Sequence, residues 1–365
     1  MISLKKEREI KKMSKRLGVA VIGTSVMANY HMNAVDANPH TELVAICDKH
    51  PELIVPRAAE HNVKKTYTDY KEMYKDPDID LVIVCTPDFV HEEMTVGALE
   101  AGKHVLCEKP MALTAEECAR MVEASKQYAP KMMVGQICRY TPAFKLAKEL
   151  IERGEIGELY AVESEYAHDY KYASPGVDNW RRDPAHPREG FIGGGCHAVD
   201  LLRWIAGNPT NVMAFSNRKC LTDWPVDDAT FAIMQFPNDV IGKVYVSIGC
   251  KRGYTMRSVF SGTKGTIICN NTDTTLTLFK EDVPDINALF PSHSKDVPPI
   301  TRMEIPTPVN NHNTHGELDE FVDCILNDKP VKMTAEEGAS TVAVCLAAVE
   351  SAKTKKLIEV KYPEK

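Results

Sequence analysis

Residues 17–28 read LGVAVIGTSVMA, a short apolar run that ends in a glycine turn. The run is too continuous for a half-exposed strand, so it predicts a strand buried on both faces, as in a parallel sheet. A helical pattern begins directly after the turn, and this context is that of a dinucleotide-binding fingerprint. Gly23 permits the tight turn, and the helix N-terminus offers unpaired N–H groups to a pyrophosphate.

The turn departs from the full fingerprint at two positions. Ser25 stands where the second glycine is expected, and Ala28, a tolerated substitute, stands at the third. Ser25 places a Cβ where the backbone should approach phosphate most closely, which weakens the motif. We still predict that the turn, Gly23, Thr24, Ser25 and Val26, binds the cofactor.

Asp48 strengthens this prediction. It ends the second apolar run 25 positions after Gly23 (48 − 23), near the spacing at which an acidic residue accepts hydrogen bonds from the adenine ribose. A carboxylate there would repel a 2′-phosphate and therefore favours NAD over NADP, although Lys49 next to it weakens this argument. The alternative is that Asp48 only starts the turn before a helix at Pro51.

The alternation of elements along the chain predicts two domains. Buried strands are expected at 17–22, 43–47, 81–85, 104–107 and 132–134, with helices at 27–37, 51–61, 91–101 and 115–128. This pattern predicts a doubly wound α/β sheet, a Rossmann dinucleotide-binding domain over residues 17–138. Longer alternating segments between 158 and 279, a helix at 142–153, a loop at 282–308 and helices at 317–326 and 335–352 follow. They predict a second α/β domain, residues 139–365, whose antiparallel sheet has one covered face and one face that is solvated or paired with another subunit.

Composition excludes several classes of protein. The chain has 365 residues and a net charge of −7, and it lacks a basic patch interleaved with aromatic residues, so nucleic acid is not an expected partner. Eleven cysteines without a C-x-x-C pair argue against zinc or iron–sulfur ligation and against a closed disulfide framework. A reducing cytoplasm is the expected location, without a membrane span.

The first sixteen residues are strongly basic. Their position before the apolar run 17–23 imitates a signal peptide. The apolar run is short and is needed as the first strand of the fold, so residues 1–16 are interpreted as a basic N-terminal extension.

Polar residues follow the apolar strands at the edge where an open parallel sheet binds its ligands. Thr86 and Pro87, with His91 on the next helix, are placed to flank the nicotinamide ribose; the alternative is an ordinary loop and helix start. Glu108-Lys109-Pro110 closes the strand 104–107. Lys109 there is placed to polarise a hydroxyl or carbonyl group, although the tripeptide alone also fits a surface Glu–Lys pair before a proline turn.

A second constellation lies in the second domain. Gly193-Gly194-Gly195 is interpreted as a flexible approach to a helix that begins near Cys196. His197 and Asp200 are three apart on that helix and share one face. Because positive potential at a helix N-terminus favours neutral imidazole, His197 suits the role of a general base. The alternative is a structural histidine that faces the core.

The order of these motifs resembles the Gfo/Idh/MocA oxidoreductase family. The residues that carry the resemblance are the glycine turn, Asp48, Cys85-Thr86-Pro87-x-x-x-His91, Gly102–Pro110, Arg139-Tyr140 and Gly193-Gly194-Gly195-x-His197-x-x-Asp200. The resemblance implies a Rossmann domain followed by an α/β domain with an open, mostly antiparallel sheet. It also implies NAD(P)-linked redox chemistry on a sugar, cyclitol or similar polyol, and homodimers or homotetramers that form through the open sheet.

The resemblance also assigns roles to residues. His197 is implied to be the base, Lys109 to hydrogen-bond the reacting oxygen, and Asp200 to orient the imidazole or a substrate hydroxyl. Many family members carry an Asp four residues before the histidine, where this chain has Gly193, so the usual proton relay does not carry over intact. The further contacts that we expect are Glu108, Gln136, Trp180 and Arg181 to the cofactor, and Arg139, Tyr166, Arg181 and His315 to the substrate.

Several of these contacts have alternatives. Trp180-Arg181 fits a pocket-lining pair but also a buried structural Trp beside a surface Arg. Tyr166, His168, Tyr170 and Tyr172 fit a sugar pocket or strand-edge packing. His312-x-x-His315 with Glu317 has metal-ligand residue types, but it lies in a Pro/Asn-rich loop, so we expect substrate contact or helix capping and no metal.

These observations predict an NAD-dependent dehydrogenase of a secondary alcohol in a sugar, glycoside or cyclitol. A second hypothesis is a hydrolase or lyase that keeps NAD bound and oxidises its substrate transiently, which the missing Asp at Gly193 leaves open. A third is a non-catalytic sensor that binds NAD.

Overall fold

The computed structural model describes residues 16–173, 179–281 and 300–363, which fall into two compact units. The first comprises the chain up to Ala112 together with Glu116–Gly135 and Thr314–Gly338, and the second comprises Leu113–Ala115, Gln136–Asn313 and Ala339–Lys365. The basic N-terminal extension, except Arg16, and most of the expected loop lie outside the described residues. The part of that loop that is described is not a loop, because Ile300–Pro306 forms strand β14.

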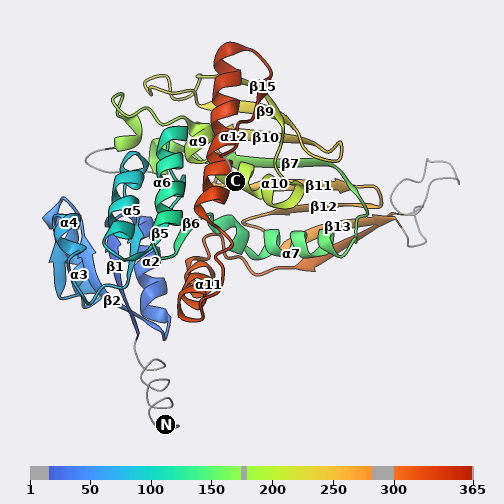
Figure 1. The fold of residues 1–365 in the computed structure, drawn as a ribbon. Coiled ribbons are helices and arrows are strands. Elements are labelled where there is room, and N and C mark those ends of the chain that lie inside the picture. The colour runs from blue at the N-terminus through green and yellow to red at the C-terminus, as the bar shows by residue number, and fades with distance from the viewer. Residues whose placement is uncertain (1–15, 174–178, 282–299, 364–365) are drawn as a thin grey trace, which may run out of the picture. The chain divides into compact units, whose positions relative to one another are not determined.

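The first unit is built on a six-stranded sheet in the order β3-β2-β1-β4-β5-β6, in which all neighbours are parallel. Figure 1 labels β1, β2, β5 and β6 of this sheet. The strands are β1 (Leu17–Ile22), β2 (Thr41–Cys47), β3 (Lys65–Tyr67), β4 (Leu81–Val84), β5 (His104–Glu108) and β6 (Met132–Gly135). Strands β4 and β6 are buried throughout, as their continuous apolar sequence requires. This is the predicted doubly wound Rossmann sheet, and its strand order reverses between β1 and β4.

Six helices and one 3-10 turn accompany this sheet: α2 (Val26–Ala37), α3 (Pro51–Glu60), α4 (Tyr70–Met73), η1 (Asp88–Val90), α5 (His91–Glu100), α6 (Ala115–Gln127) and α11 (Thr314–Leu326). Helix α11 comes late in the chain and packs against α2. The same late segment also accepts a hydrogen bond from the sheet, because the N–H of Val134 in β6 donates to the Met333 carbonyl at 2.9 Å. The division at residue 138 that we predicted from the sequence differs from the structure here, because it placed α11 in the second domain.

The second unit contains a nine-stranded sheet in the order β14-β13-β12-β11-β7-β10-β9-β8-β15. Its strands are β7 (Leu159–Ala167), β8 (Asn211–Asn217), β9 (Ala229–Gln235), β10 (Ile241–Ser247), β11 (Arg257–Gly262), β12 (Gly265–Asn270), β13 (Thr275–Glu281), β14 and β15 (Ile358–Glu359). All neighbours are antiparallel except β7 and β10. The predicted mostly antiparallel sheet is therefore confirmed.

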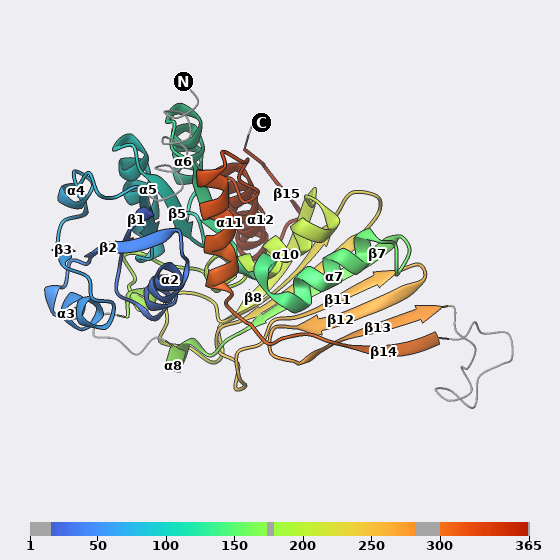
Figure 2. The same ribbon diagram turned by 90° about the horizontal axis from the view of Figure 1, so that it is seen from below.

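Helices cover one face of this sheet (Figure 2). They are α7 (Pro142–Glu152), α10 (Cys196–Ala206) and α12 (Ala335–Thr354), and the short elements η2 (Ile137–Tyr140), α8 (Tyr170–Ala173), η3 (Trp180–Arg182) and α9 (Gly190–Gly193) complete the unit. Helix α10 packs on β7 and α7 on β12. No helix in the described part of the chain combines the length and the apolar character needed to cross a bilayer.

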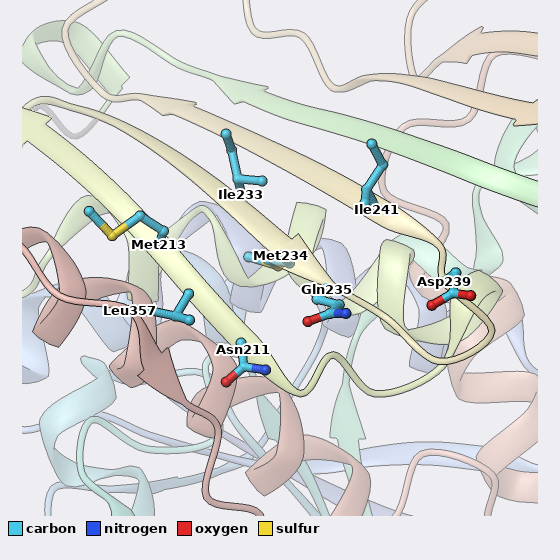
Figure 3. Close-up of a pocket in the computed structure, with 8 residues that line it drawn as sticks. All are labelled: Asn211, Met213, Ile233, Met234, Gln235, Asp239, Ile241 and Leu357. Carbon is cyan, nitrogen blue, oxygen red and sulfur yellow. The ribbon is translucent and has the colours of Figure 1, made fainter.

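The opposite face of the sheet exposes apolar side chains. Along β9 the burial alternates residue by residue, as expected for a sheet with one covered face. Phe231 and Ile233 on β9 point outward and are more than half exposed, as is Ile241 on β10. Figure 3 shows Ile233 and Ile241 with Met213 of β8 and with Leu357, which line a shallow groove on this face.

Candidate active site

The glycine turn joins β1 to α2 at the carboxyl edge of the first sheet. Gly23 has φ +102°, and a Cβ there would lie 2.5 Å from the Cys85 carbonyl oxygen, so both the backbone conformation and the packing against the end of β4 require glycine. Ser25 caps α2, because its Oγ accepts the N–H of Ala28 at 3.3 Å. Val26, the first helical residue, is two-thirds exposed. The turn thus presents a helix N-terminus to a ligand despite its departure from the full motif.

Asp48 is fixed beside this turn. Its Oδ2 accepts a hydrogen bond from the Thr24 hydroxyl at 2.7 Å, and its Oδ1 accepts the N–H of His50 at 3.0 Å. The carboxylate is therefore oriented by the turn itself and remains partly exposed. A carboxylate held in this way at the end of β2 is suited to accept hydrogen bonds from ribose hydroxyls.

The end of β4 carries a buried hydroxyl and a charged imidazole. Thr86 Oγ1 is buried and has no hydrogen-bond partner among the described residues. Both ring nitrogens of His91 lie against carbonyl oxygens, Nδ1 at 2.9 Å from Pro110 and Nε2 at 3.1 Å from Thr86. Burial alone would lower the pKa of His91, but its interactions with Cys107, with the Asp88 carboxylate and with the Pro110 carbonyl outweigh burial and raise the pKa to about 9. Protonated His91 thus holds together the loops that follow β4 and β5.

Glu108 is not part of a surface pair, because its side chain is only 7% exposed. Its Oε1 lies 2.8 Å from Nε2 of His31 on α2, and its Oε2 accepts the backbone N–H of Lys109 at 3.0 Å. Burial by itself would raise the pKa of Glu108, but the hydrogen bond and charge of His31 and the proximity of Lys109 lower it. The ionised carboxylate therefore clamps the backbone of the residue that follows it. The peptide bond between Lys109 and Pro110 is cis.

The ammonium group of Lys109 is available to a ligand. Within the described ranges, no hydrogen-bond or ion-pair partner contacts its Nζ, and the side chain is partly exposed. The backbone of Lys109 is held by Glu108, but its ammonium group has no partner among the described residues. Such an ammonium group is suited to stabilise negative charge on a bound oxygen.

Helix α11 adds a carboxyl group that sequence reasoning had not placed at this site. Glu317 is fully buried, and neither of its carboxyl oxygens has a hydrogen-bond partner among the described residues. Burial and the nearby charge of Glu108 raise the pKa of Glu317 well above its usual range, so the group is neutral. His315 on the same helix is exposed. No cluster of three or more His, Cys, Asp or Glu among the described residues is arranged to hold a metal ion.

In the second unit, the glycine triplet precedes α10 as expected but is not a flexible approach. Gly193 ends α9, and all three glycines are buried. A Cβ on Gly193 would lie 2.1 Å from the guanidinium of Arg188, and one on Gly194 would lie 2.2 Å from the ring of Tyr166. Arg188, which also donates to the Gly193 carbonyl at 2.9 Å, occupies the space that the side chain of an Asp at position 193 would enter.

His197 lies in the first turn of α10 and is almost fully buried. Its Nδ1 is 3.2 Å from the Sγ of Cys138 in η2. The ring of Tyr166 on β7 stacks against the imidazole with centroids 6.0 Å apart. Neither neighbour is adjacent to His197 in sequence, so the motif alone could not identify them.

Asp200, one turn further along α10, is committed to Arg139. The guanidinium of Arg139 donates two hydrogen bonds to its carboxylate, from Nε to Oδ2 and from Nη2 to Oδ1, both at 2.8 Å. Thr341 on α12 donates to the same Oδ1 at 3.0 Å. The carboxylate is fully buried, and its strongest described contact is the bidentate pair with Arg139.

An aromatic cluster within the second unit contacts His197 through Tyr166. Tyr166, His168, Tyr170 and Tyr254 contact one another edge-on or tilted, with ring centroids 4.6 to 6.4 Å apart. The Tyr166 hydroxyl lies 3.0 Å from Nδ1 of His168 and 3.3 Å from the Tyr170 hydroxyl. The guanidinium of Arg181 stacks on its neighbour Trp180 at 4.3 Å. Aromatic faces edged with hydroxyl and guanidinium groups suit a polyhydroxylated ligand.

Gln136 begins the second unit with a buried side-chain amide. Neither its oxygen nor its nitrogen has a hydrogen-bond partner among the described residues. These unpaired polar atoms fit a ligand with hydroxyl or amide groups, because buried polar groups are otherwise satisfied. Within the first unit, the glycine turn, Asp48 and the buried Thr86 hydroxyl fit NAD.

Comparison with known proteins gives the same result. The family model described as "Oxidoreductase family, NAD-binding Rossmann fold" matches residues 17–136, and that described as "GFO/IDH/MocA C-terminal domain" matches residues 144–268. Levoglucosan dehydrogenase from Pseudarthrobacter phenanthrenivorans is 28% identical over 291 residues, 70% of this chain and 73% of the relative. Myo-inositol 2-dehydrogenase from Thermotoga maritima is 24% identical over 355 residues, 94% of this chain and 98% of the relative.

Comparison with solved structures finds the same kind of protein. The solved structure of levoglucosan dehydrogenase in complex with NADH and L-sorbose superposes with a TM-score of 0.83 and 26% identity, over 96% of this chain and 100% of that one. The first matched model spans all six strands of the parallel sheet, and the second spans β7 to β11 and part of β12 in the mostly antiparallel sheet. The chain therefore belongs to the GFO/IDH/MocA family of oxidoreductases and carries the NAD-binding Rossmann domain of that family.

Proposed function

We propose that this protein is an NAD-dependent dehydrogenase that interconverts a secondary alcohol and a ketone on a sugar, glycoside or cyclitol. The substrate class is supported by the relatives, which are named as levoglucosan and inositol dehydrogenases. It is also supported by the aromatic cluster that contacts His197 through Tyr166, since such rings pack on the C–H faces of sugar rings.

The observation that carries the proposal is the state of Lys109. The buried Glu108 carboxylate clamps its backbone at the end of β5, and its ammonium has no other partner among the described residues. A purely structural lysine would be expected to pair its charge. An uncommitted cation at the ligand edge of a Rossmann sheet is instead suited to an oxygen that gains negative charge during reaction.

The proposed chemistry needs three functions. NAD, when bound, supplies the hydride acceptor. We assign His197 as the base that accepts the hydroxyl proton of the substrate and Lys109 as the hydrogen-bond donor to the same oxygen. Asp200 then acts through Arg139, whose guanidinium it fixes as a donor toward substrate hydroxyls.

Cofactor and substrate contacts follow from the same proposal. Gly23, Thr24, Ser25 and Val26 hold the pyrophosphate at the N-terminus of α2, and Asp48 holds the adenine ribose. His91 contributes indirectly, since both of its ring nitrogens contact carbonyl oxygens of the loops after β4 and β5. The remaining proposed contacts are Thr86, Pro87, Gln136, Trp180 and Arg181 for the cofactor, and Tyr166, Arg181 and His315 for the substrate.

The test compares Lys109→Ala with Lys126→Ala, an exposed lysine on α6. Inositols, pyranosides and their phosphates are screened for NAD reduction, and NADH binding is followed by fluorescence. Lys109→Ala should bind NADH but lose about 100- to 10,000-fold in kcat, while Lys126→Ala remains active. Full turnover of Lys109→Ala would refute the assignment. Product formation without net reduction of NAD would indicate a transient-oxidation hydrolase or lyase, and NAD binding without turnover of any polyol would indicate a sensor.

We also propose that the protein forms a homodimer or homotetramer through the open face of the second sheet. Phe231 and Tyr245 stack across β9 and β10 with centroids 4.3 Å apart, and Phe215, Ile233, Ile241 and Leu357 add exposed apolar surface. Exposed apolar patches of this kind mark interaction sites. A cytoplasmic location fits the eleven cysteines, all of which are free thiols.

A further inference from the structure

Two sulfur atoms lie in series behind the imidazole of His197. The Sγ of Cys138 is 3.2 Å from the Nδ1 of His197 and 3.7 Å from the Sδ of Met256. The hydroxyl of Tyr254 donates to the same Sδ at 3.2 Å. Cys138, His197 and Met256 are all buried, so these contacts are made without competition from bulk water.

The donors and acceptors of these groups restrict where the protons lie. A thioether has no hydrogen and only accepts, so the contact between Cys138 and Met256 is a hydrogen bond only when the thiol hydrogen points to Sδ. A thiol has a single hydrogen. Once this hydrogen points to Met256, the Sγ atom can only accept from Nδ1, which must then carry a proton.

We infer that Cys138 is a positioning residue that fixes the tautomer of His197. The order of donors is Nδ1–H of His197 to Sγ of Cys138, and then Sγ–H to Sδ of Met256. This order leaves the lone pair on Nε2, the atom that must accept the substrate proton. The tautomer can be measured without a substrate. Only the expected effect on turnover rests on the proposed function.

The reverse order has the opposite consequence. If the thiol donated to Nδ1, the proton of neutral imidazole would lie on Nε2, and this nitrogen would be a donor. His197 would then be unable to act as a base through Nε2. Met256 thus determines the state of the imidazole through the sulfur of Cys138.

The first experiment records the tautomer directly. The full-length protein, labelled with ¹⁵N in histidine, is examined by two-bond ¹H–¹⁵N correlation spectra, in which protonated and unprotonated ring nitrogens have well separated shifts. The His197 signals are assigned by their loss in His197→Gln. We expect a protonated Nδ1 and an unprotonated Nε2 in the neutral ring. The reverse pattern would overturn the inference.

The second experiment removes the acceptor for the thiol hydrogen. Met256→Leu preserves the core volume, but of the two described acceptors it leaves the thiol only Nδ1, so His197 should shift toward the Nε2–H form. We expect kcat to fall about 10- to 100-fold with little change in KM. Tyr254→Phe, which removes the other hydrogen bond to Sδ, should leave the tautomer unchanged. An unchanged tautomer in Met256→Leu would also overturn the inference.

Variants of Cys138, combined with Met256→Leu, form a double-mutant cycle. Cys138→Ala should lower kcat by a similar factor, and adding Met256→Leu to it should have no further effect, because Met256 acts through the sulfur. Cys138→Ser, whose hydroxyl both accepts and donates, should restore kcat to within about threefold of wild type. Cys269→Ala controls for the loss of a buried thiol elsewhere in the same unit. Additive effects of the two substitutions would contradict a chain of donors.

The two proposals fail in different ways. If His197→Ala retained turnover, the proposed base would be wrong, whatever the tautomer. If His197→Ala were inactive while the tautomer did not respond to Met256, the base would stand and the role of Cys138 would fall.

Discussion

The Nε2 atom of His31 lies 2.8 Å from the Oε1 of Glu108, and both side chains are buried within the first unit. The second oxygen of the same carboxylate holds the backbone N–H of Lys109. Through Glu108, His31 on α2 therefore helps to fix the backbone of Lys109, the residue that we propose as the hydrogen-bond donor to the reacting oxygen.

Removing His31 should destabilise the protein, because it leaves a buried carboxylate with one partner fewer. We expect His31→Leu to lower the free energy of unfolding by about 2–4 kcal/mol at pH 7. The pKa of Glu108 is lowered in the folded state, so its stabilising contribution is present above the unfolded pKa of a glutamate and is lost as the pH falls through the folded value. The effect of His31→Leu should therefore shrink toward pH 4. Urea titrations at pH 4 and pH 7 test this, and an equal loss at both values would contradict it.

Glu317 should behave in the opposite way. Its pKa is raised in the folded state, so stability is greatest below the unfolded pKa of a glutamate and falls as the pH rises toward the folded value. We expect Glu317→Gln to raise the free energy of unfolding by about 1–3 kcal/mol at pH 7 and by much less at pH 4.5. Glu320→Gln on the same helix, which loses a surface ion pair and a minor one of the charges that raise the pKa of Glu317, should show only a small part of this trend.

The contributions of His91 and His104 to the free energy of unfolding should change with pH in opposite directions. The pKa of His91 is raised to about 9, so its contribution is complete below the unfolded pKa of about 6.5 and is lost as the pH rises through 9. Burial and the charge of Lys131 lower the pKa of His104, whose Nδ1 accepts the N–H of Lys131; its contribution is lost as the pH falls. The destabilisation caused by His91→Ala should decrease between pH 6 and pH 9.5, and that of His104→Ala should decrease between pH 7 and pH 5. Parallel trends would refute the assigned charge states.

Arg139 and Asp200 should act as one unit. Because the pair is bidentate, Arg139→Lys should not preserve its function. We expect Arg139→Lys and Asp200→Asn each to lower kcat/KM about 10- to 100-fold, with NADH affinity retained. The double variant should be little worse than either single one. Multiplied losses in the double variant would show that the two residues act independently.

The open sheet face should control the oligomeric state. Phe231→Asp together with Ile233→Glu places two charges on the exposed side of β9 without altering its buried side. We expect light scattering after size exclusion to show a monomer, while the wild type is dimeric or larger. A monomeric wild type would refute the proposal. Tyr160→Asp, on a different part of the surface of the second unit, serves as the control.

Five of the six parallel strands of the first sheet could be predicted because burial on both faces leaves an unbroken apolar run in the sequence. The sixth, the short edge strand β3 with sequence KTY, has no such run and was not predicted. Strand β14 could not be predicted in this way. Its sequence, ITRMEIP, contains both a proline and charged residues, and the strand lies at the edge of the sheet, where only β13 pairs with it. Edge strands carry weak sequence signals because one side of the strand lacks a neighbour.

The candidate site, too, contains residues that the sequence predicts and residues that it does not. Lys109 and His197 follow motifs that can be recognised locally, but their partners cannot. Glu108 meets His31 across 77 positions, and His197 meets Cys138 across 59. The sequence gives no local signal that a histidine in the first helix or a cysteine after the last parallel strand will contact these motifs, because only the three-dimensional fold brings them together.

The membership of α11 in the first unit determines when that unit can be completed during synthesis. Thr314–Gly338 leaves the ribosome only after strands β7 to β14 of the second sheet have been made, and Thr314 comes 179 positions after Gly135 (314 − 135). At about 5–20 residues per second, the nascent cofactor unit spends on the order of ten seconds or more without the helix that covers α2. A fragment that ends at residue 138 would keep that face of α2 exposed permanently. We therefore expect a discontinuous fragment that carries the α11 segment on a linker to be more stable than one that ends at residue 138.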